Sequence, residues 1–302
     1  MRKLIGPASL IIGVIAAPAW AHAGHDHDAS PVWTWDPWIT MPLALSALVF
    51  VLGWWRLHAR SSTGRARLRT RAQLFAGGWL TLAGALVSPL HQAGERSFAM
   101  HMIEHELLML LAAPLLVMAE PLSAMLWAFP LEGRRRIGQA SASPIIAPPF
   151  RWLTSAGVAT LIQAAMLWIW HMPSLFDLAL AHQGWHAAQH LCFIVSALFF
   201  WTAMLGRCGA GAGAAANRAL AAFCLLVTSL VTGALGALMA LASSPWYAGY
   251  ARSALSPFGL SPAEDQQLAG LIMWLPGGLV HLFVALALFR TLLTPRRTAD
   301  AV

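Results

Sequence analysis

Residues 266–290 read QQLAGLIMWLPGGLVHLFVALALFR, and this stretch determines the class of the protein. Its ionisable residues are His281 and Arg290, and it exceeds the roughly 20 apolar residues that an α-helix needs to cross a bilayer. We therefore predict a transmembrane helix here. Six further stretches are also long and apolar enough to span: residues 37–57, 72–90, 100–120, 152–172, 185–205 and 219–242.

The composition of the whole chain agrees with a membrane protein. Of its 302 residues, 58% are hydrophobic and 10% are charged, and the mean hydropathy is +0.63. Soluble proteins carry about a quarter charged residues, so the composition excludes a water-soluble domain. We predict an all-α polytopic bundle of seven transmembrane spans. The net charge of +7 is accounted for by arginines in the predicted cytoplasmic loops, as shown below. We therefore expect no nucleic-acid partner.

The amino-terminal residues have the pattern of a secretory signal peptide. Met1-Arg2-Lys3 precede a short apolar run over residues 4–17, and Ala19-Trp20-Ala21 follow as a small-residue cleavage site. We predict cleavage after Ala21, with an uncleaved anchor as the alternative. The predicted organisation is a signal peptide over 1–21, a His-rich periplasmic tail over 22–36, the membrane domain over 37–290 and a cytoplasmic tail over 291–302.

The arginines predict the orientation in the membrane, because Lys and Arg collect in cytoplasmic loops. Only Arg96 and Arg252 lie in the connections assigned to the outer side. We therefore predict a periplasmic amino end and a cytoplasmic carboxyl end. The fifteen arginines assigned to the inner side are Arg56, Arg60, Arg65, Arg67, Arg69, Arg71, Arg134, Arg135, Arg136, Arg151, Arg207, Arg218, Arg290, Arg296 and Arg297.

Histidines gather at the outer ends of the predicted spans. His101 and His105 are four residues apart, as are His186 and His190, so each pair shares one helix face. Imidazole is the commonest metal ligand in proteins, and two at this spacing can converge on one ion. Together with His171, at the end of the fourth span, they predict a metal site in the outer half of the membrane. Each imidazole taken singly fits equally well at the interface, bonding water and backbone.

Neighbouring residues refine this prediction. Thioether sulfur favours Cu(I), so Met102 and Met172 are predicted as soft supplementary ligands and copper as the metal. Asp265 and Gln266 open the last span and are predicted to orient a ligand imidazole from outside the ligand shell, although helix capping is the simpler account of Asp265. The predicted accessory ligands are His182 and the tail residues His22, His25 and His27. The tail tract could equally be a solvated linker.

Three other functions fit parts of the pattern. His101-x-x-Glu104-His105 matches the H-x-x-E-H helix of inverted zinc peptidases, with Glu104 as general base. Paired histidines from two helices could instead be the axial ligands of haem in a redox membrane protein. A copper transporter would need ionisable or Met residues that continue towards the inner face. Past Met109, the sequence offers only Glu120 and His281 for that path.

A longer series of motifs resembles one family. The order runs His101-Met102-x-x-His105, Trp170-His171-x-Pro173, Leu175-Phe176-Asp177, His186-x-x-x-His190, Phe200-Trp201, Trp246-Tyr247, D-Q-Q-L-A-G over residues 265–270, and Met273-Trp274. Over roughly residues 72–290, this order resembles the CtaG-type cytochrome c oxidase assembly factors of the caa3 class.

The resemblance implies a multi-span protein of the bacterial inner membrane that is not an enzyme. It implies a role in the biogenesis of cytochrome c oxidase through its copper, with the oxidase subunits and a periplasmic copper donor as partners. Composition and spacing by themselves indicate only a membrane protein with an outward-facing cluster of histidines.

Overall fold

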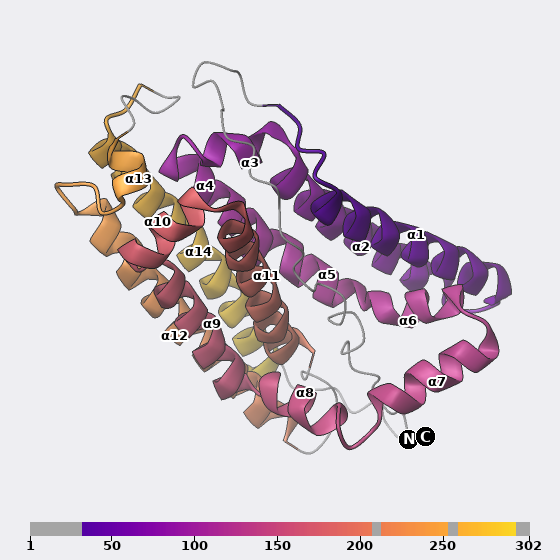
Figure 1. Ribbon diagram of the computed structural model, residues 1–302. Helices are drawn as coiled ribbons and strands as arrows, with labels where there is room; N and C mark the ends of the chain where they lie inside the picture. Colours follow the sequence, from indigo (N-terminus) through magenta and orange to yellow (C-terminus); the bar gives the residue numbers. More distant parts are fainter. Residues whose placement is uncertain (1–31, 207–212, 253–258, 294–302) are drawn as a thin grey trace.

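The computed structural model describes residues 32–206, 213–252 and 259–293. The predicted signal peptide, the three tail histidines and most of the predicted cytoplasmic tail lie outside these ranges. Within them the chain is helical and contains no β-strand (Figure 1). The all-α prediction is therefore confirmed for the described residues.

The helices follow one another with short connections. In chain order they are α1 (Pro37–Arg60), α2 (Arg65–Val87), α3 (Pro89–Gly94), α4 (Phe98–Glu106), the π-helical turn η2 (Leu107–Ala112), α5 (Ala113–Ala119), α6 (Pro121–Met125), the 3-10 turn η3 (Leu126–Ala128), α7 (Leu131–Ser141), α8 (Ala147–Leu153), α9 (Ala156–Trp170), α10 (Pro173–Ala181), α11 (Gln183–Leu205), α12 (Ala214–Ala240), α13 (Ala248–Ala251) and α14 (Pro262–Leu293).

Five helices among the described residues are long and apolar enough to cross a membrane, so this is a membrane protein. They are α1, α11, α12, α14 and the continuous stretch Phe98–Ala119, which contains α4, η2 and α5. The predicted fourth span corresponds to α8 and α9, which are bent by 68° and make a sixth span only if taken together. Seven spans thus remain a prediction.

The remaining predicted span corresponds to α2, a 23-residue helix. Its first two turns carry Arg65, Arg67, Arg69 and Arg71. These charges leave only its second part apolar. The apolar part of α2 is therefore too short for α2 to count among the candidate spans.

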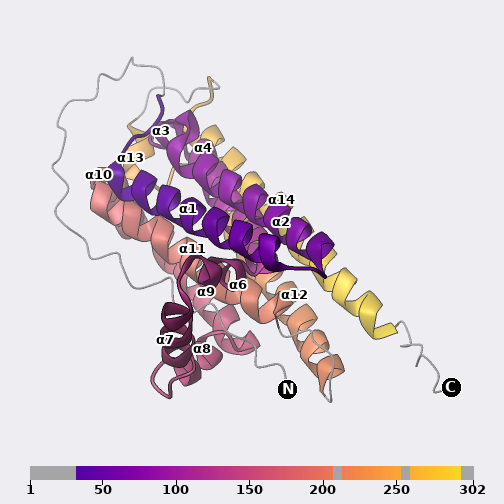
Figure 2. The same ribbon diagram turned by 90° about the vertical axis from the view of Figure 1, so that its right-hand side faces the viewer.

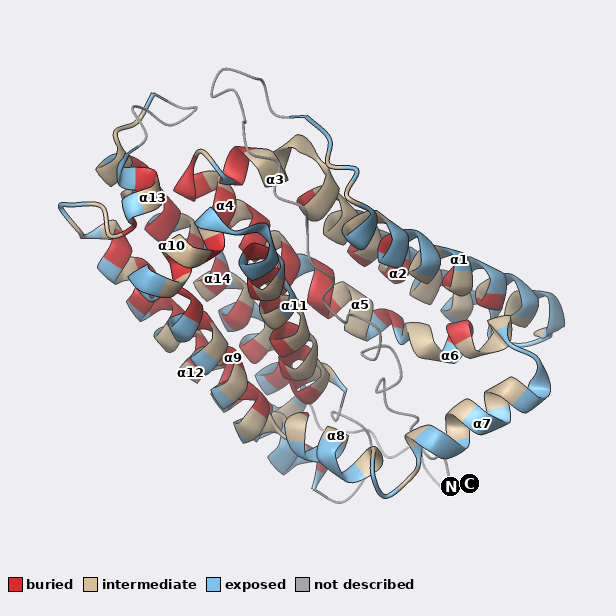
Figure 3. Cartoon of the chain, viewed as in Figure 1, coloured by how far each residue is buried: buried red, intermediate tan, exposed pale blue. Residues whose placement is uncertain are grey.

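The helices pack around two groups of buried side chains. The larger includes Phe98 on α4, Leu167 on α9 and Phe193 on α11, with further residues from α12 and α14. The smaller joins α1, α2, α5 and α6 around Phe50 and Phe75, whose rings stack with centroids 3.7 Å apart. Buried residues concentrate in the helices of the larger group, whereas α7 lies to the side of the bundle (Figures 2 and 3).

Glycines let α12 and α14 approach each other closely. A Cβ atom added at Gly270 would lie 2.5 Å from the carbonyl oxygen of Gly236, and one added at Gly236 would lie 2.8 Å from that of Gly270. Small residues at such crossings are typical of membrane helices, which associate by close backbone packing. This contact holds α14 against the rest of the larger core.

The amino end of α14 also positions α4. The buried carboxylate of Asp265 accepts hydrogen bonds from the Ser97 hydroxyl at 2.8 Å and the Phe98 backbone N–H at 2.6 Å. Ser97 is the N-cap of α4, so an acidic side chain from a distant helix satisfies donors that the helix itself cannot pair. The first turn of α4 is therefore fixed against α14.

We predict that replacing Gly270 by Ala destabilises the protein by about 1–3 kcal/mol, because the added methyl group overpacks a backbone contact. Unfolding of the purified protein in detergent, followed by circular dichroism, should begin at a lower temperature. Gly84→Ala is the matched control, because a Cβ atom there meets no atom within 4 Å. Equal unfolding temperatures for the two variants would contradict the close α12–α14 packing.

Candidate metal centre

Four histidines from two helices form the centre of the candidate site. His101 and His105 lie on α4 and His186 and His190 on α11, and all four are buried. Within each helix the ring centroids are 4.2 Å apart for His101 and His105 and 4.4 Å apart for His186 and His190. Between the helices they are 5.2 Å apart for His101 and His186 and 5.1 Å apart for His105 and His190. The two pairs therefore face each other, and every ring contacts at least one ring of the opposite pair.

The fifth predicted ligand, His171, lies at the edge of this group. It ends α9, and its ring centroid is 6.5 Å from that of His105. The His171 Nδ1 is 2.7 Å from the backbone oxygen of Leu167, so this nitrogen donates and Nε2 is left as the free ring atom. The Tyr247 hydroxyl donates to the His171 carbonyl at 3.1 Å. His101, His105, His171, His186 and His190 are called the histidine cluster below.

Two residues outside the predicted ligand set, His91 and Glu104, contact the histidine cluster. The carboxylate of Glu104, which is fully buried, is 2.7 Å from His91 Nδ1 and 3.7 Å from His190 Nδ1. His91, on α3, also stacks on His186 with centroids 5.2 Å apart. Burial acts to lower the pKa of His91, but the hydrogen bond and the charge of Glu104 outweigh it and raise that pKa above its ordinary value.

The sequence carried only weak signals for these two residues. His91 follows directly after the predicted second span, with no partner at helical spacing in its own helix. Glu104 stands out in the sequence only as the general base of the H-x-x-E-H motif. Their meeting depends on the turn between α2 and α4, whose geometry the residue spacing does not specify.

Many ring nitrogens of the histidine cluster have no hydrogen-bond partner within the described residues. Buried polar atoms are nearly always paired, and an unpaired one costs about 1–3 kcal/mol. Several unpaired nitrogens in one small volume therefore form a set of ligand atoms that could bind a metal ion together. The unpaired atoms are Nδ1 and Nε2 of His101 and of His105, and Nε2 of His171, His186 and His190.

Two overlapping triads have the geometry to hold a metal ion. The ligand atoms of His101, His186 and His190 lie within 4.8 Å of one another, and so do those of His91, Glu104 and His190. Metal–imidazole bonds of about 2 Å bring ligand nitrogens to roughly 3.5 Å apart. Each triad could therefore close on one ion with small side-chain rotations. His190 belongs to both.

Several predicted site residues lie away from the cluster. Met172 is 53% exposed, which does not suit a ligand enclosed with the histidines, whereas Met102 is buried in the larger core. His182 is exposed at the N-cap of α11. His22, His25 and His27 lie outside the described residues.

Asp265 and Gln266, predicted to orient a ligand imidazole, form hydrogen bonds with other groups instead. Asp265 caps α4, as described above, and so acts on His101 only through the position of its helix. Gln266 accepts from the Trp246 N–H at 2.6 Å and donates to the Ser244 carbonyl at 3.2 Å. It therefore holds the loop before α13.

A second polar chamber lies deeper in the bundle. Glu106, Gln163 and His281 line a cavity of about 20 Å³ together with the thioethers of Met109 and Met273. Gln163 Nε2 donates to Met109 Sδ at 3.4 Å, while one oxygen of Gln163 and one of Glu106 have no partner in the described part of the chain. A cavity of this size holds about one water molecule. His281, in the middle of α14, is thus a polar residue of the bundle interior.

Comparison with known families identifies the chain. Residues 48–294 match the family model described as cytochrome c oxidase caa3 assembly factor. Searches of curated proteins and of solved structures found no match. The matched region includes both histidine pairs, His171, the His91–Glu104 contact and the whole of α14. The chain belongs to the cytochrome c oxidase caa3 assembly factor family.

Proposed function

We propose that this assembly factor binds copper in the histidine cluster and delivers it to the apo-oxidase. The observation that carries the proposal is the group of buried imidazole nitrogens without hydrogen-bond partners. Imidazole suits copper and zinc alike. Copper is favoured because the family serves cytochrome c oxidase, an enzyme that contains copper.

The two triads suggest how copper enters and is held. The His91 side chain is 13% exposed and those of Glu104 and His190 are 0% and 8% exposed, so His91 lies nearest the surface. Copper would first meet His91, Glu104 and His190. It would then pass to the triad of His101, His186 and His190, and His190 would keep one bond throughout.

The alternative functions receive less support from the geometry. A haem plane would have to separate rings whose centroids are 4.2–5.2 Å apart, whereas a single ion fits between them. A zinc peptidase would need Glu104 free to act on a bound water, but this carboxylate already contacts His91. Copper transport across the membrane has the chamber around Glu106 and His281 in its favour.

The orientation follows from the arginines. We propose that the histidine cluster lies on the periplasmic side of the bacterial inner membrane, where a periplasmic copper donor and the oxidase subunits would reach it. The amino end would then be periplasmic and the carboxyl end cytoplasmic, which requires an odd number of spans.

We predict that His186→Ala weakens copper binding at least tenfold, since loss of even an outer-layer partner costs about 10–100-fold in metal affinity. The full-length protein is purified in detergent, loaded with Cu(I) under reducing conditions and titrated with a Cu(I) chelator. His182→Ala is the matched control, because it lies four residues earlier on the same helix and is exposed. The control should retain copper like the unmodified protein.

The same samples test the alternatives. Unchanged copper retention by His186→Ala would contradict the proposed site. Retention of zinc in preference to copper would favour the peptidase, and a Soret band in the purified protein would favour haem.

We also predict that a reporter fused to the carboxyl terminus lies in the cytoplasm. Green fluorescent protein fused there should fluoresce, and alkaline phosphatase fused there should be inactive. The opposite result would reverse the orientation and put the histidine cluster on the cytoplasmic side, out of reach of a periplasmic donor.

A further inference from the structure

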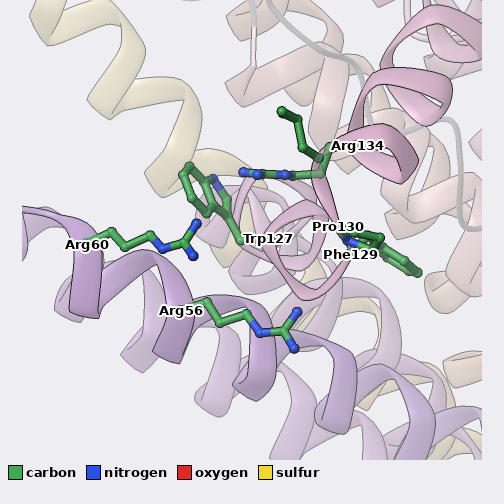
Figure 4. Close-up of a pocket in the computed structure, with 7 residues that line it drawn as sticks. Arg56, Arg60, Trp127, Phe129, Pro130 and Arg134 are labelled. Carbon is green, nitrogen blue, oxygen red and sulfur yellow. The ribbon is translucent and has the colours of Figure 1, made fainter.

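A second site lies at the far end of α1 from the histidine cluster. A cavity of about 360 Å³ opens between the end of α1 and the segment from η3 to α7 (Figure 4). Its polar lining comes from Arg56, Arg60 and Arg134, and Trp127, Phe129 and Leu131 provide apolar surface. The volume falls in the range of small-molecule pockets.

The positive charge of this pocket is not neutralised by acidic residues. In the described ranges, the carboxylates nearest in sequence pair with other arginines. Glu120 contacts Arg71, and Glu132 contacts Arg136. Three guanidinium groups therefore converge without an ion pair to any described carboxylate, which suits an anionic ligand.

The aromatic ring of Trp127 fixes two of the guanidinium groups. The Cζ atom of Arg134 lies 4.2 Å from the ring centroid and that of Arg60 lies 5.9 Å from it. Figure 4 shows both arginines directed towards the ring. Arg56 donates to the carbonyl of Ala128. The Nε of Arg134 is buried without a hydrogen-bond partner in the described chain.

The pocket lies at the level expected for lipid headgroups. α1 has 24 residues and is therefore about 36 Å long, close to the thickness of a bilayer. At its amino end, Asp36 accepts a hydrogen bond from Gln183, at the start of the helix that carries His186. Arg56 and Arg60 are near its carboxyl end, so the pocket is on the opposite membrane face from the cluster. Tryptophan is typical of this interfacial zone.

We propose that this pocket binds the phosphate of an anionic phospholipid headgroup. Arginine pairs with phosphate through parallel hydrogen bonds, and the apolar rim of Phe129 and Leu131, which are 41% and 55% exposed, would contact the glycerol and upper acyl chains. A lipid seated here would join α1 to the α6–α7 segment. The site is independent of copper binding.

The test uses full-length protein in a neutral detergent and native mass spectrometry. The probes are phosphatidylglycerol, phosphatidylcholine and inorganic phosphate. We expect phosphatidylglycerol to remain bound and Arg134→Gln to weaken that binding roughly tenfold, as expected for loss of a charge-assisted phosphate contact. Arg60→Gln should act in the same direction. Arg135→Gln, an exposed neighbour with the same charge change, should bind like the unmodified protein.

The outcomes separate the sources of phosphate. Competition by millimolar inorganic phosphate that removes the lipid completely would mean that the pocket takes free phosphate, and it would overturn the lipid assignment. Equal affinity for phosphatidylcholine, or equal loss in Arg134→Gln and Arg135→Gln, would overturn the anionic site itself. Copper retention by the same variants verifies that they are folded.

Discussion

Two pairs of imidazoles face each other inside the membrane bundle, and the cost of burying their unpaired nitrogens constrains everything around them. Water can pair such atoms at a surface, but where α4 and α11 meet, the described residues do not supply enough protein partners. The surrounding helices must therefore hold the rings together, and the proposed copper ion would bind nitrogens that the described side chains leave unpaired. A metal ion would bind several of these nitrogens at once.

The framework serves this constraint at several points. Asp265 fixes the first turn of α4 and Tyr247 holds the end of α9, so two of the helices that carry cluster histidines are positioned by residues far away in sequence. Directly after Glu106 the helix adopts a π-helical turn, a feature often found at functional sites. The Met109 carbonyl within that turn accepts from the Trp201 indole at 2.8 Å. The histidine cluster is therefore held in place by contacts at the helix ends and at the π-helical turn.

Residue spacing predicted those parts of the structure that depend on local periodicity. The apolar stretch over residues 266–290 lies within α14, and the four-residue spacing of both histidine pairs brings their rings together within each helix. Contacts that depend on bends and turns escaped prediction. His91 and Glu104 meet because α3 folds back on α4, Met172 is turned outward at the end of α9, and Asp265 caps a helix 168 residues earlier. The bend between α8 and α9 likewise has no periodic signal.

X-ray absorption at the copper edge can show whether copper is bound by the imidazoles of the histidine cluster. Measured on copper-loaded, full-length protein, the spectrum should show about three nitrogen neighbours near 2 Å, with the outer-shell scattering of imidazole rings. Loss of one of these neighbours in the His186→Ala protein would tie the signal to this site. Coordination by sulfur alone, near about 2.3 Å, would contradict the account.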